Sequence, residues 1–289
     1  MVSGIGCPEC RLPLERLRCA SCGVEYAVRD GIPWLVCRTR PSAARQATYY
    51  DEAVDAEFEI TRPHGTPRLY GRLLREKFRR SVRGVELCGR SVLVVCAGSG
   101  MDAEFLARSG ACVTTVDISH GAATRTLERA RRAGFDLVPL VADVERLPFV
   151  DASFDVVYVH DGLHHLDRPE RGLEEMTRVA RHAVCVTEPA RAAVTAAAVR
   201  LGLAEAVEDA GNVVERLDAG RVVRVLGRSG FRPVRVERYA MLYRHEPGAA
   251  MRFLSLAPVY PLVLATFLFA NRVLGRVGNK LVVVGVREG

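Results

Sequence analysis

The sequence predicts an α/β fold, in which an open, mainly parallel sheet is covered by helices and preceded by a small cysteine-rich domain. Two observations predict it. From about residue 88 to 189, short β-branched runs alternate with stretches of helical pattern, which is typical of parallel strands joined by helices. Before them, four of the nine cysteines form two tight pairs within the first 22 residues. A chain of 289 residues can hold one large domain and one small appendage.

The first 40 residues carry the cysteine pairs, Cys7 with Cys10 and Cys19 with Cys22. Each C-x2-C pair presents two thiolates from one turn, and two such turns complete the tetrahedral sulfur cage that Zn2+ accepts. Four thiolates leave no open coordination position, so the expected zinc is structural. Residues 1–40 are therefore predicted to be a zinc ribbon in a reducing compartment.

Residues 41–87 are expected to form a helical lid or linker. Pro41 to Ala43 are interpreted as a linker, and Thr48 to Arg83 has a helical pattern with a break at Arg62 to Gly65. The main domain is placed at residues 88–289. Its seven expected strands are Ser91–Cys96, Val113–Val116, Leu137–Val141, Asp155–Val159, Ala183–Thr187, Val234–Tyr239 and Leu281–Val286.

An apolar insertion is expected at about residues 250–276, where Phe253 to Asn271 is a run of 19 uncharged residues. A membrane-spanning helix needs about 20 apolar residues, but Pro258 and Pro261 interrupt the run, and spanning would pull apart two strands of one sheet. A buried lid is the first interpretation and a membrane-surface patch the second. Either one suggests a partly apolar substrate.

Composition sets the remaining limits. An apolar share of 49% and a charged share of 26% are ordinary for a globular protein and exclude a long disordered or collagen-like chain. The net charge of +7 comes from basic residues spread along the chain, of which only Lys77 and Lys280 are lysines, so nucleic acid is a minor alternative as partner. The first residues lack the pattern of a secretory signal, so a cytoplasmic location is expected, with peripheral membrane contact as an addition.

A glycine turn follows the first strand of the main domain. Gly98 and Gly100 let the backbone approach a ligand at the start of the next helix. On its own this signal is weak, since it also fits a dinucleotide-binding turn. Asp117, at the end of the next strand, stands where a ribose diol would be held.

These residues, together with Asp143-x-x-x-Leu147-Pro148-Phe149 and with Phe154-Asp155 leading to Leu163-His164-His165-Leu166, resemble the class I S-adenosylmethionine-dependent methyltransferases. The resemblance spans about residues 88 to 189 and implies a Rossmann-like, seven-stranded methyltransferase sheet. It also implies that Asp117 binds the ribose, Asp143 the adenine amino group and the glycine turn the methionine end. The cofactor-binding residues expected on this basis are Gly98, Ser99, Gly100, Asp102, Asp117, Ile118, Asp143, Val144 and His160. The N-terminal segment similarly resembles zinc ribbons fused to, or partnered with, methyltransferases, including those that act on guanine in large-subunit ribosomal RNA.

Two positions depart from the pattern of that family. Val94 stands where an acid is usual, and Cys96 where a glycine is usual. The missing acid removes a common anchor near the methionine ammonium group. Asp102 is a candidate to replace it, but a carboxylate in the first helical turn is equally explained by the helix dipole.

A base for methyl transfer is sought at the end of the fourth strand, where ligands of open α/β sheets collect. His164 and His165 lie there, and neighbouring residues on a turn or helix point about 100° apart. Glu188 follows the next strand and is expected to orient the base. His165 with Glu188 is the preferred pair, with His164 second. Packing is the alternative explanation for either histidine.

Four residues before the cofactor domain are candidates for gripping the acceptor: Tyr50, Arg62, His64 and Tyr70. The alternative interpretation is that these four residues belong to a solvated surface and bind no acceptor.

The function predicted is methyl transfer from S-adenosylmethionine to a small molecule, by O-methylation of a natural product of secondary metabolism or of a lipid-linked or sugar acceptor. An rRNA base methyltransferase that uses the ribbon to bind RNA is the first alternative. A non-catalytic cofactor-binding or scaffold protein is the second, favoured by Val94 and Cys96. The sequence leaves the oligomeric state open.

Overall fold

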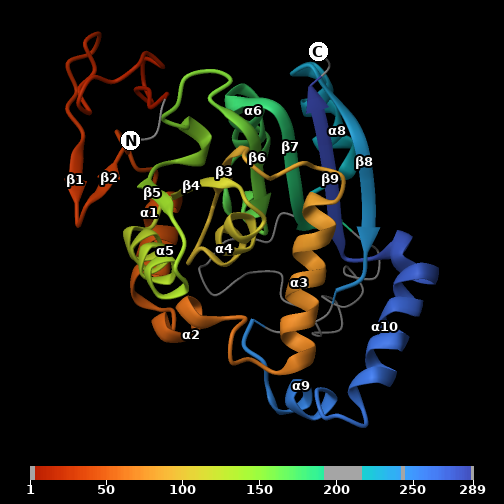
Figure 1. Cartoon of the computed structure of the whole chain (residues 1–289). Helices are drawn as coiled ribbons and strands as arrows, with labels where there is room; N and C mark the ends of the chain where they lie inside the picture. The colour runs from red at the N-terminus through yellow and green to blue at the C-terminus, as the bar shows by residue number, and fades with distance from the viewer. Residues whose placement is uncertain (1–3, 192–216, 242–244, 288–289) are drawn as a thin grey trace.

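A computed structural model of the chain describes residues 4–191, 217–241 and 245–287 (Figure 1). The strands are β1 (Ala27–Arg29), β2 (Ile32–Trp34), β3 (Ser91–Val95), β4 (Cys112–Asp117), β5 (Leu137–Val141), β6 (Phe154–His160), β7 (Ala180–Pro189), β8 (Phe231–Tyr239) and β9 (Lys280–Arg287). The α-helices are α1 (Pro41–Glu52), α2 (Ala56–Thr61), α3 (Arg68–Val82), α4 (Met101–Arg108), α5 (His120–Ala133), α6 (Pro169–Val179), α8 (Ala219–Arg228), α9 (Ala249–Leu254) and α10 (Tyr260–Leu274). The described residues also form the short 3-10 helices η1 (Val144–Arg146), η2 (Leu163–His165) and η3 (Gly275–Val277).

The strands form one sheet in the order β1-β2-β5-β4-β3-β6-β7-β9-β8. From β2 to β7 all neighbours are parallel, whereas β9 runs antiparallel between β7 and β8. The seven strands from β5 to β8 are the expected methyltransferase sheet, and the Rossmann-like α/β fold is confirmed. The carboxyl ends of β3, β4 and β6 meet at one edge, the lower one in Figure 1.

Two helical layers explain why the central strands are apolar throughout. In β3, Leu93 and Val95 pack into the cluster that includes Leu173 and Met176 of α6. Val92 and Val94 face the other way, into a cluster with the apolar side of α3. A parallel strand buried on both faces needs a continuous apolar run rather than alternation, and this run made the strand recognisable in the sequence.

The cysteine-rich segment does not stand apart from the main sheet. Its hairpin, β1 and β2, extends the sheet at the β5 edge through the pair Trp34 and Val141. The sheet therefore has nine strands rather than seven. Edge strands expose unpaired backbone groups, and the hairpin pairs with the last residue of β5, Val141.

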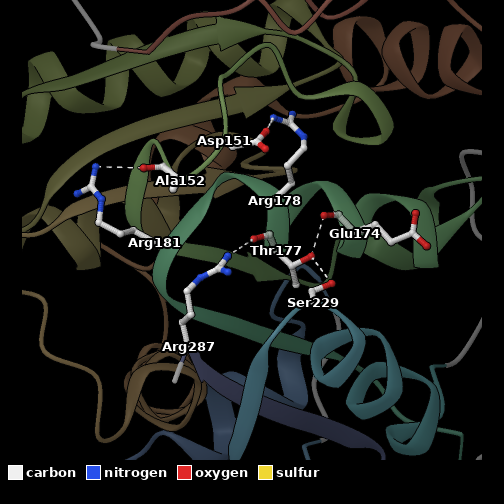
Figure 2. A pocket seen from close by; sticks show the side chains of 8 residues that line it. All are labelled: Asp151, Ala152, Glu174, Thr177, Arg178, Arg181, Ser229 and Arg287. Atoms are coloured by element: carbon white, nitrogen blue, oxygen red, sulfur yellow. Dashed lines mark hydrogen bonds and ion pairs between the residues drawn. The ribbon is translucent and has the colours of Figure 1, made fainter. Parts of the chain in front are cut away.

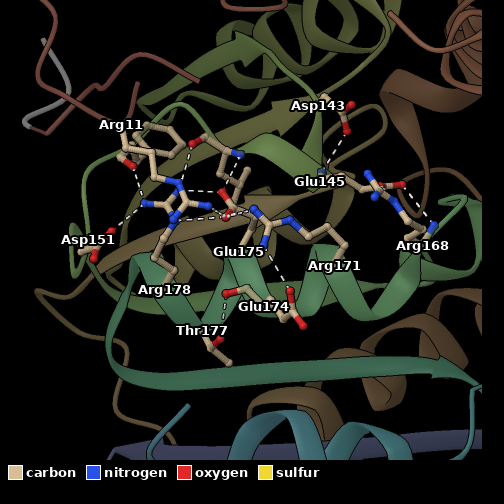
Figure 3. Close-up of polar contacts among 12 residues, drawn as sticks. Arg11, Asp143, Glu145, Asp151, Arg168, Arg171, Glu174, Glu175, Thr177 and Arg178 are labelled. Atoms are coloured by element: carbon tan, nitrogen blue, oxygen red, sulfur yellow. Dashed lines mark hydrogen bonds and ion pairs between the residues drawn. The ribbon is translucent and has the colours of Figure 1, made fainter. Parts of the chain in front are cut away.

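Charged contacts also join the ribbon to the main domain around Glu175 of α6 (Figure 3). The carboxylate of Glu175 is buried and accepts hydrogen bonds from Arg11 of the ribbon at 3.1 Å, Arg171 at 3.0 Å and Arg178 at 2.6 Å. It also accepts the backbone amide of Leu147 at 3.0 Å. The two domains are thus held together through a buried carboxylate.

The helical segment after the ribbon begins earlier than expected. Pro41 to Ala43, interpreted above as a linker, form the first turn of α1. Proline suits the first helical position because its fixed φ is helical and its missing N–H needs no partner there. At the other end of α1, the Asp51 carboxylate accepts the Ser119 hydroxyl at 2.6 Å and the Gly121 amide at 2.7 Å. Helix α1 is therefore hydrogen-bonded to the start of α5, next to the end of β4.

The apolar insertion lies between β8 and β9 and forms α9 and α10. It is not the buried lid expected first. Val263, Leu264 and Phe267 of α10 pack against the sheet-side cluster, but Leu262 and Phe269 are 71% and 69% exposed. The apolar side chains of α10 are distributed around the whole helix. Those on one face therefore pack against the core, and those on the opposite face are exposed. In the described part of the chain, no helix combines the length and apolar content needed to cross a membrane.

Candidate active site

The turn between β3 and α4 is built from left-handed backbone positions. Gly98 has φ 54° and Gly100 has φ 78°, and α4 starts directly after Gly100. A Cβ at Gly98 would meet nothing within 4 Å, whereas one at Gly100 would lie 2.9 Å from Cγ2 of Thr126. Gly98 thus leaves open space for a ligand, and Gly100 allows α5 to pack closely. The hydroxyl of Ser99 is buried and accepts a bond from Arg125 of α5 at 2.9 Å, so it serves the scaffold.

The two departures from the family pattern have structural counterparts. Val94 is 2% exposed and belongs to the apolar cluster beneath α3, where an acid would lose its hydration. Cys96 has φ 49°, and a Cβ at Gly162 would lie 2.3 Å from its Cβ. Glycine at 162 therefore makes room for the side chain at 96. Burial raises the pKa of the Cys96 thiol well above its usual value, which favours the neutral thiol over the thiolate.

Asp117 ends β4 beside the glycine turn. Its carboxylate accepts the backbone amides of Gly98 at 2.8 Å and Ser119 at 3.0 Å. Burial raises the pKa of this carboxyl, and the amides oppose that rise. Each oxygen keeps acceptor capacity, so the group can still receive a pair of hydroxyls. Ile118 follows it, half-buried.

Asp143 lies after β5, where an adenine amino group was expected. In the structure both its oxygens accept from the guanidinium group of Arg40, at 3.0 and 3.2 Å. Arg40 also pairs with Glu145 and with Asp167, and it immediately precedes α1. No sequence pattern pointed to Arg40. Val144 directly follows Asp143, and its side chain is buried in the core. It can therefore offer a ligand only an apolar contact.

Asp102 and His160 form a buried pair at this edge of the sheet. Oδ2 of Asp102 lies 2.7 Å from Nδ1 of His160. Burial alone would raise the pKa of Asp102, but the facing His160 lowers it below its usual value. Oδ1 of Asp102 and Nε2 of His160 are buried and have no hydrogen-bond partner among the described residues. An ionised carboxylate with a free buried oxygen is the right chemistry for an ammonium group.

Asp161, next to His160, gathers both lysines of the chain. Its oxygens lie 2.7 Å from Nζ of Lys77 in α3 and 2.5 Å from Nζ of Lys280 in β9. Burial opposes ionisation, but Lys280 and then Lys77 hold the pKa of Asp161 well below its usual range. Asp161 also lies 3.6 Å from Nε2 of His160. The sequence reasoning noted the two lysines without using them and missed this cluster.

The expected pairing of Glu188 with His165 is wrong. Oε2 of Glu188 lies 2.7 Å from Nδ1 of His164, and Oε1 accepts the amides of Gly162 and Leu163 at 2.9 and 2.8 Å. Glu188 is fully buried and His164 is 4% exposed. The backbone of η2 places Nδ1 of His164, rather than the ring of His165, beside the Glu188 carboxylate. Glu188 fixes η2 through His164 and the backbone.

His165 is half-buried, and its ring packs against the ring of His164. Its ring lies 4.1 Å from that of His164 and 6.0 Å from that of Tyr50 in α1, centroid to centroid, the latter edge-on. Four residues are expected to bind the acceptor. Among the contacts found within the described residues, Tyr50 is the one of these four that contacts His165.

The other three residues, Arg62, His64 and Tyr70, lie away from His165, in the region of Glu59 and Glu104. Arg62 donates to Glu59 at 3.1 Å, and His64 lies 2.8 Å from Glu104. The Tyr70 side chain is buried and donates its hydroxyl to the backbone oxygen of His245 at 2.6 Å, which leaves it poorly placed to grip a ligand. His64 borders a hollow of about 990 Å³ between the α2–α3 turn and α9.

A second hollow, of about 440 Å³, lies at the opposite edge of the sheet (Figure 2). It is bordered by the start of β7 and the end of β9. Arg178 binds Asp151 there at 2.9 Å, and Arg287 donates to the Thr177 carbonyl at 3.1 Å. Its arginines already hold protein partners, such as Asp155 for Arg181 and Glu175 for Arg178, and the hollow is remote from the glycine turn.

The four expected metal ligands are brought together in the ribbon. The sulfur atoms of Cys7, Cys10, Cys19 and Cys22 all lie within 4.8 Å of one another. Tyr26 closes one side, with its hydroxyl 3.2 Å from Sγ of Cys7. A set of four thiol sulfurs fits the tetrahedral preference of Zn2+. The cluster can hold a metal ion, and the identity of that ion stays a prediction.

Comparisons with known proteins agree with this geometry. Residues 93–185 match the profile of a family described as a methyltransferase domain. A demethylmenaquinone methyltransferase from Clavibacter sepedonicus is 42% identical over 94 residues, which are 32% of this chain and 38% of the relative. The chain therefore spans less than two fifths of that relative. The matched domain and the name of this relative support an S-adenosylmethionine-dependent methyltransferase.

Solved structures resemble the chain over most of its length. Magnesium protoporphyrin IX methyltransferase from Synechocystis, with bound S-adenosylhomocysteine, has a TM-score of 0.56 and 16% identity, covering 84% of this chain and 98% of its own. The cyclase SpnF has a TM-score of 0.55 and 16% identity, covering 86% and 97%. One fold thus accompanies two reactions, and at these identities the likeness establishes the fold alone.

Proposed function

We propose that this chain transfers the methyl group of S-adenosylmethionine to an oxygen atom of a small, partly apolar acceptor in secondary metabolism. One observation carries the proposal: the two-histidine turn η2, held by Glu188, follows β6 at the edge of the sheet that also bears the glycine turn. The unpaired thiols of the described chain suit the cytoplasm as its compartment.

The residues of the edge fit the cofactor. Open space at Gly98 and the unpartnered buried oxygen of Asp102 would receive its methionine end. Asp117 would accept the ribose hydroxyls, and Asp143 the adenine amino group once Arg40 yields one of its oxygens. When bound, the cofactor supplies a methyl group on a positively charged sulfur.

His165 is the residue we assign to proton removal. Among the two histidines of η2, it is the more accessible and the one that faces Tyr50 of α1. An acceptor hydroxyl must lose its proton during methyl transfer, and a neutral imidazole takes it near neutral pH. His164 and Glu188 act as positioning residues, because their buried pair fixes the turn on which His165 stands.

A second candidate acceptor follows from the relatives. Their name specifies demethylmenaquinone as the compound they act on, and the chain is 42% identical to one of them over 94 residues. The exposed apolar residues of α9 and α10 are compatible with such an acceptor. This makes demethylmenaquinone the first compound to assay.

The decisive experiment incubates the purified protein and methyl-labelled S-adenosylmethionine with host extract, with demethylmenaquinone and with ribosomal RNA in separate reactions. We expect label on a small molecule, and mass spectrometry of that product identifies the methylated atom. His165→Ala should lower turnover by about 100-fold to 10,000-fold and leave cofactor affinity within about threefold. Label on RNA would favour the nucleic-acid alternative. Absence of cofactor binding in a titration would favour the scaffold alternative.

A further inference from the structure

The exposed apolar residues of this protein are concentrated in its C-terminal part. Of the fourteen large apolar side chains that are exposed in the described chain, seven fall between residues 253 and 277. A soluble surface normally scatters such residues, and a concentration of them marks an interaction site. We call this set the apolar C-terminal face; it consists of Phe253, Leu256, Leu262, Leu268, Phe269, Val273 and Val277.

The charged residues of the segment that carries this face are all basic, whereas Asp55 and Glu246 border the neighbouring hollow. From Pro247 to Arg287 the sequence contains no Asp or Glu. Arg252, Arg272 and Arg276 lie within this stretch and are exposed. Apolar residues bordered by arginines are typical of helices that lie in the interface of a membrane with anionic lipids.

We propose that the apolar C-terminal face docks onto the surface of an anionic lipid bilayer, with α9 and α10 lying in the headgroup region. A second copy of this chain fits less well as the occupant. A two-fold symmetric dimer would set each face against its own copy, and the arginines of one copy would then meet the arginines of the other. Anionic headgroups instead complement the arginines while the acyl boundary receives the apolar side chains.

Docking in this way would place the hollow beside α9 at the lipid surface. Leu256 belongs to the apolar C-terminal face and also borders the hollow, together with Arg252 and Ser255 of the same segment. Figure 1 shows α9 beneath the start of α3, on the side of the sheet where the parallel strands end. Resting on the proposed function, this arrangement would let an apolar acceptor pass from the bilayer toward the site. The docking itself does not depend on methyl transfer.

The experiment is co-sedimentation of the full chain with vesicles. One vesicle preparation contains phosphatidylcholine alone, and the other contains equal parts of phosphatidylcholine and phosphatidylglycerol. The variants are Leu262→Glu and Phe269→Glu, whose side chains are exposed and whose replacement should leave the circular dichroism spectrum unchanged. Leu12→Glu is the matched control, because Leu12 is 51% exposed but lies in the ribbon.

We expect binding to the anionic vesicles, weaker binding to phosphatidylcholine alone, and at least a tenfold loss in Leu262→Glu and Phe269→Glu, since each exchange removes a large apolar side chain from the lipid boundary. Leu12→Glu should bind as the unaltered chain does. Equal binding by all variants, or no binding to either vesicle, overturns the proposal. A change from dimer to monomer in Leu262→Glu without an effect on vesicle binding also overturns it, in favour of a second copy. Because sedimentation needs no acceptor, these outcomes are independent of whether methyl transfer occurs.

Discussion

Asp102 is expected to hold the ammonium group of the cofactor in place of the acid that Val94 replaces. The exchange Asp102→Asn tests this with little change of volume. Asparagine keeps a polar side chain beside His160, from which Oδ2 of Asp102 is 2.7 Å away, but removes the negative charge. The other oxygen, buried and unpartnered in the described chain, is the one left for a ligand.

The size of the effect follows from the interaction lost. A hydrogen bond between an ammonium group and a buried carboxylate contributes about 1.5 to 3 kcal/mol, which corresponds to roughly 10-fold to 150-fold in affinity. The alternative role of Asp102, a first-turn carboxylate of α4, contributes only about 0.3 to 1 kcal/mol, and to stability rather than binding.

The assay is isothermal titration with two ligands. S-adenosylhomocysteine carries the amino-acid end, and methylthioadenosine has the same adenine and ribose without it. Asp102→Asn should lower affinity for S-adenosylhomocysteine by the amount above and change that for methylthioadenosine less than about threefold. Asp117→Asn should weaken both ligands, because it faces the ribose. Asp151→Asn, at the exposed far edge of the sheet, serves as the control.

An equal loss for both ligands in Asp102→Asn would refute the assignment, since it would mean that the variant disturbs the whole turn. Unchanged affinity for S-adenosylhomocysteine would also refute it, and would leave the carboxylate with its helix-stabilising role.

Four further outcomes are expected. Elemental analysis should find one Zn2+ per chain, and Cys19→Ser should lose it; equal metal in that variant would exclude the ribbon cluster as the site. Asp117→Ala should lose more cofactor affinity than Asp143→Ala, since two ribose hydroxyls donate to Asp117 and one amino group to Asp143. Because burial raises the pKa of Asp117, affinity should fall on acidification at a higher pH than for an ordinary aspartate, and Asp117→Asn should flatten that dependence; calorimetry across pH checks both, and identical profiles would contradict them. Glu175→Gln should lower the free energy of unfolding by about 3 kcal/mol, because it breaks a buried set of ion pairs; urea denaturation measures this, and a change below about 1 kcal/mol would show that the pairs contribute little.

The strands were predictable because a parallel strand buried on both faces leaves an uninterrupted apolar run, as in β3. The placing of Asp117 and of η2 at one edge followed from the same topology, since the carboxyl ends of parallel strands meet there. The apolar insertion was predicted in position but not in exposure. Hydropathy records how many apolar residues a segment has, and α10 has them on the side facing the core and on the side facing away.

Long-range pairing accounts for what the sequence could not supply. Arg40 and Asp143 are 103 residues apart, and Lys280 and Asp161 are 119 apart. No local pattern links such residues, because their contact depends on how the ribbon and the last strand fold back onto the edge of the sheet. The sequence also could not tell which of the two histidines pairs with Glu188. That pairing depends on the backbone conformation of η2, and two consecutive identical residues carry no information about it.

The ion-pair cluster at Asp161 has a consequence for labelling chemistry. Lys77 and Lys280 are the only lysines among 41 basic residues, so every ε-amine of the chain touches the same carboxylate. Isotope-enriched lysine, incorporated as the chain is made, would therefore place its ε-amine signals at this one site. Since an ammonium group responds to neighbouring charge, those signals would report directly on what enters the edge of the sheet, in a protein whose other basic side chains are nearly all arginines that carry no such label.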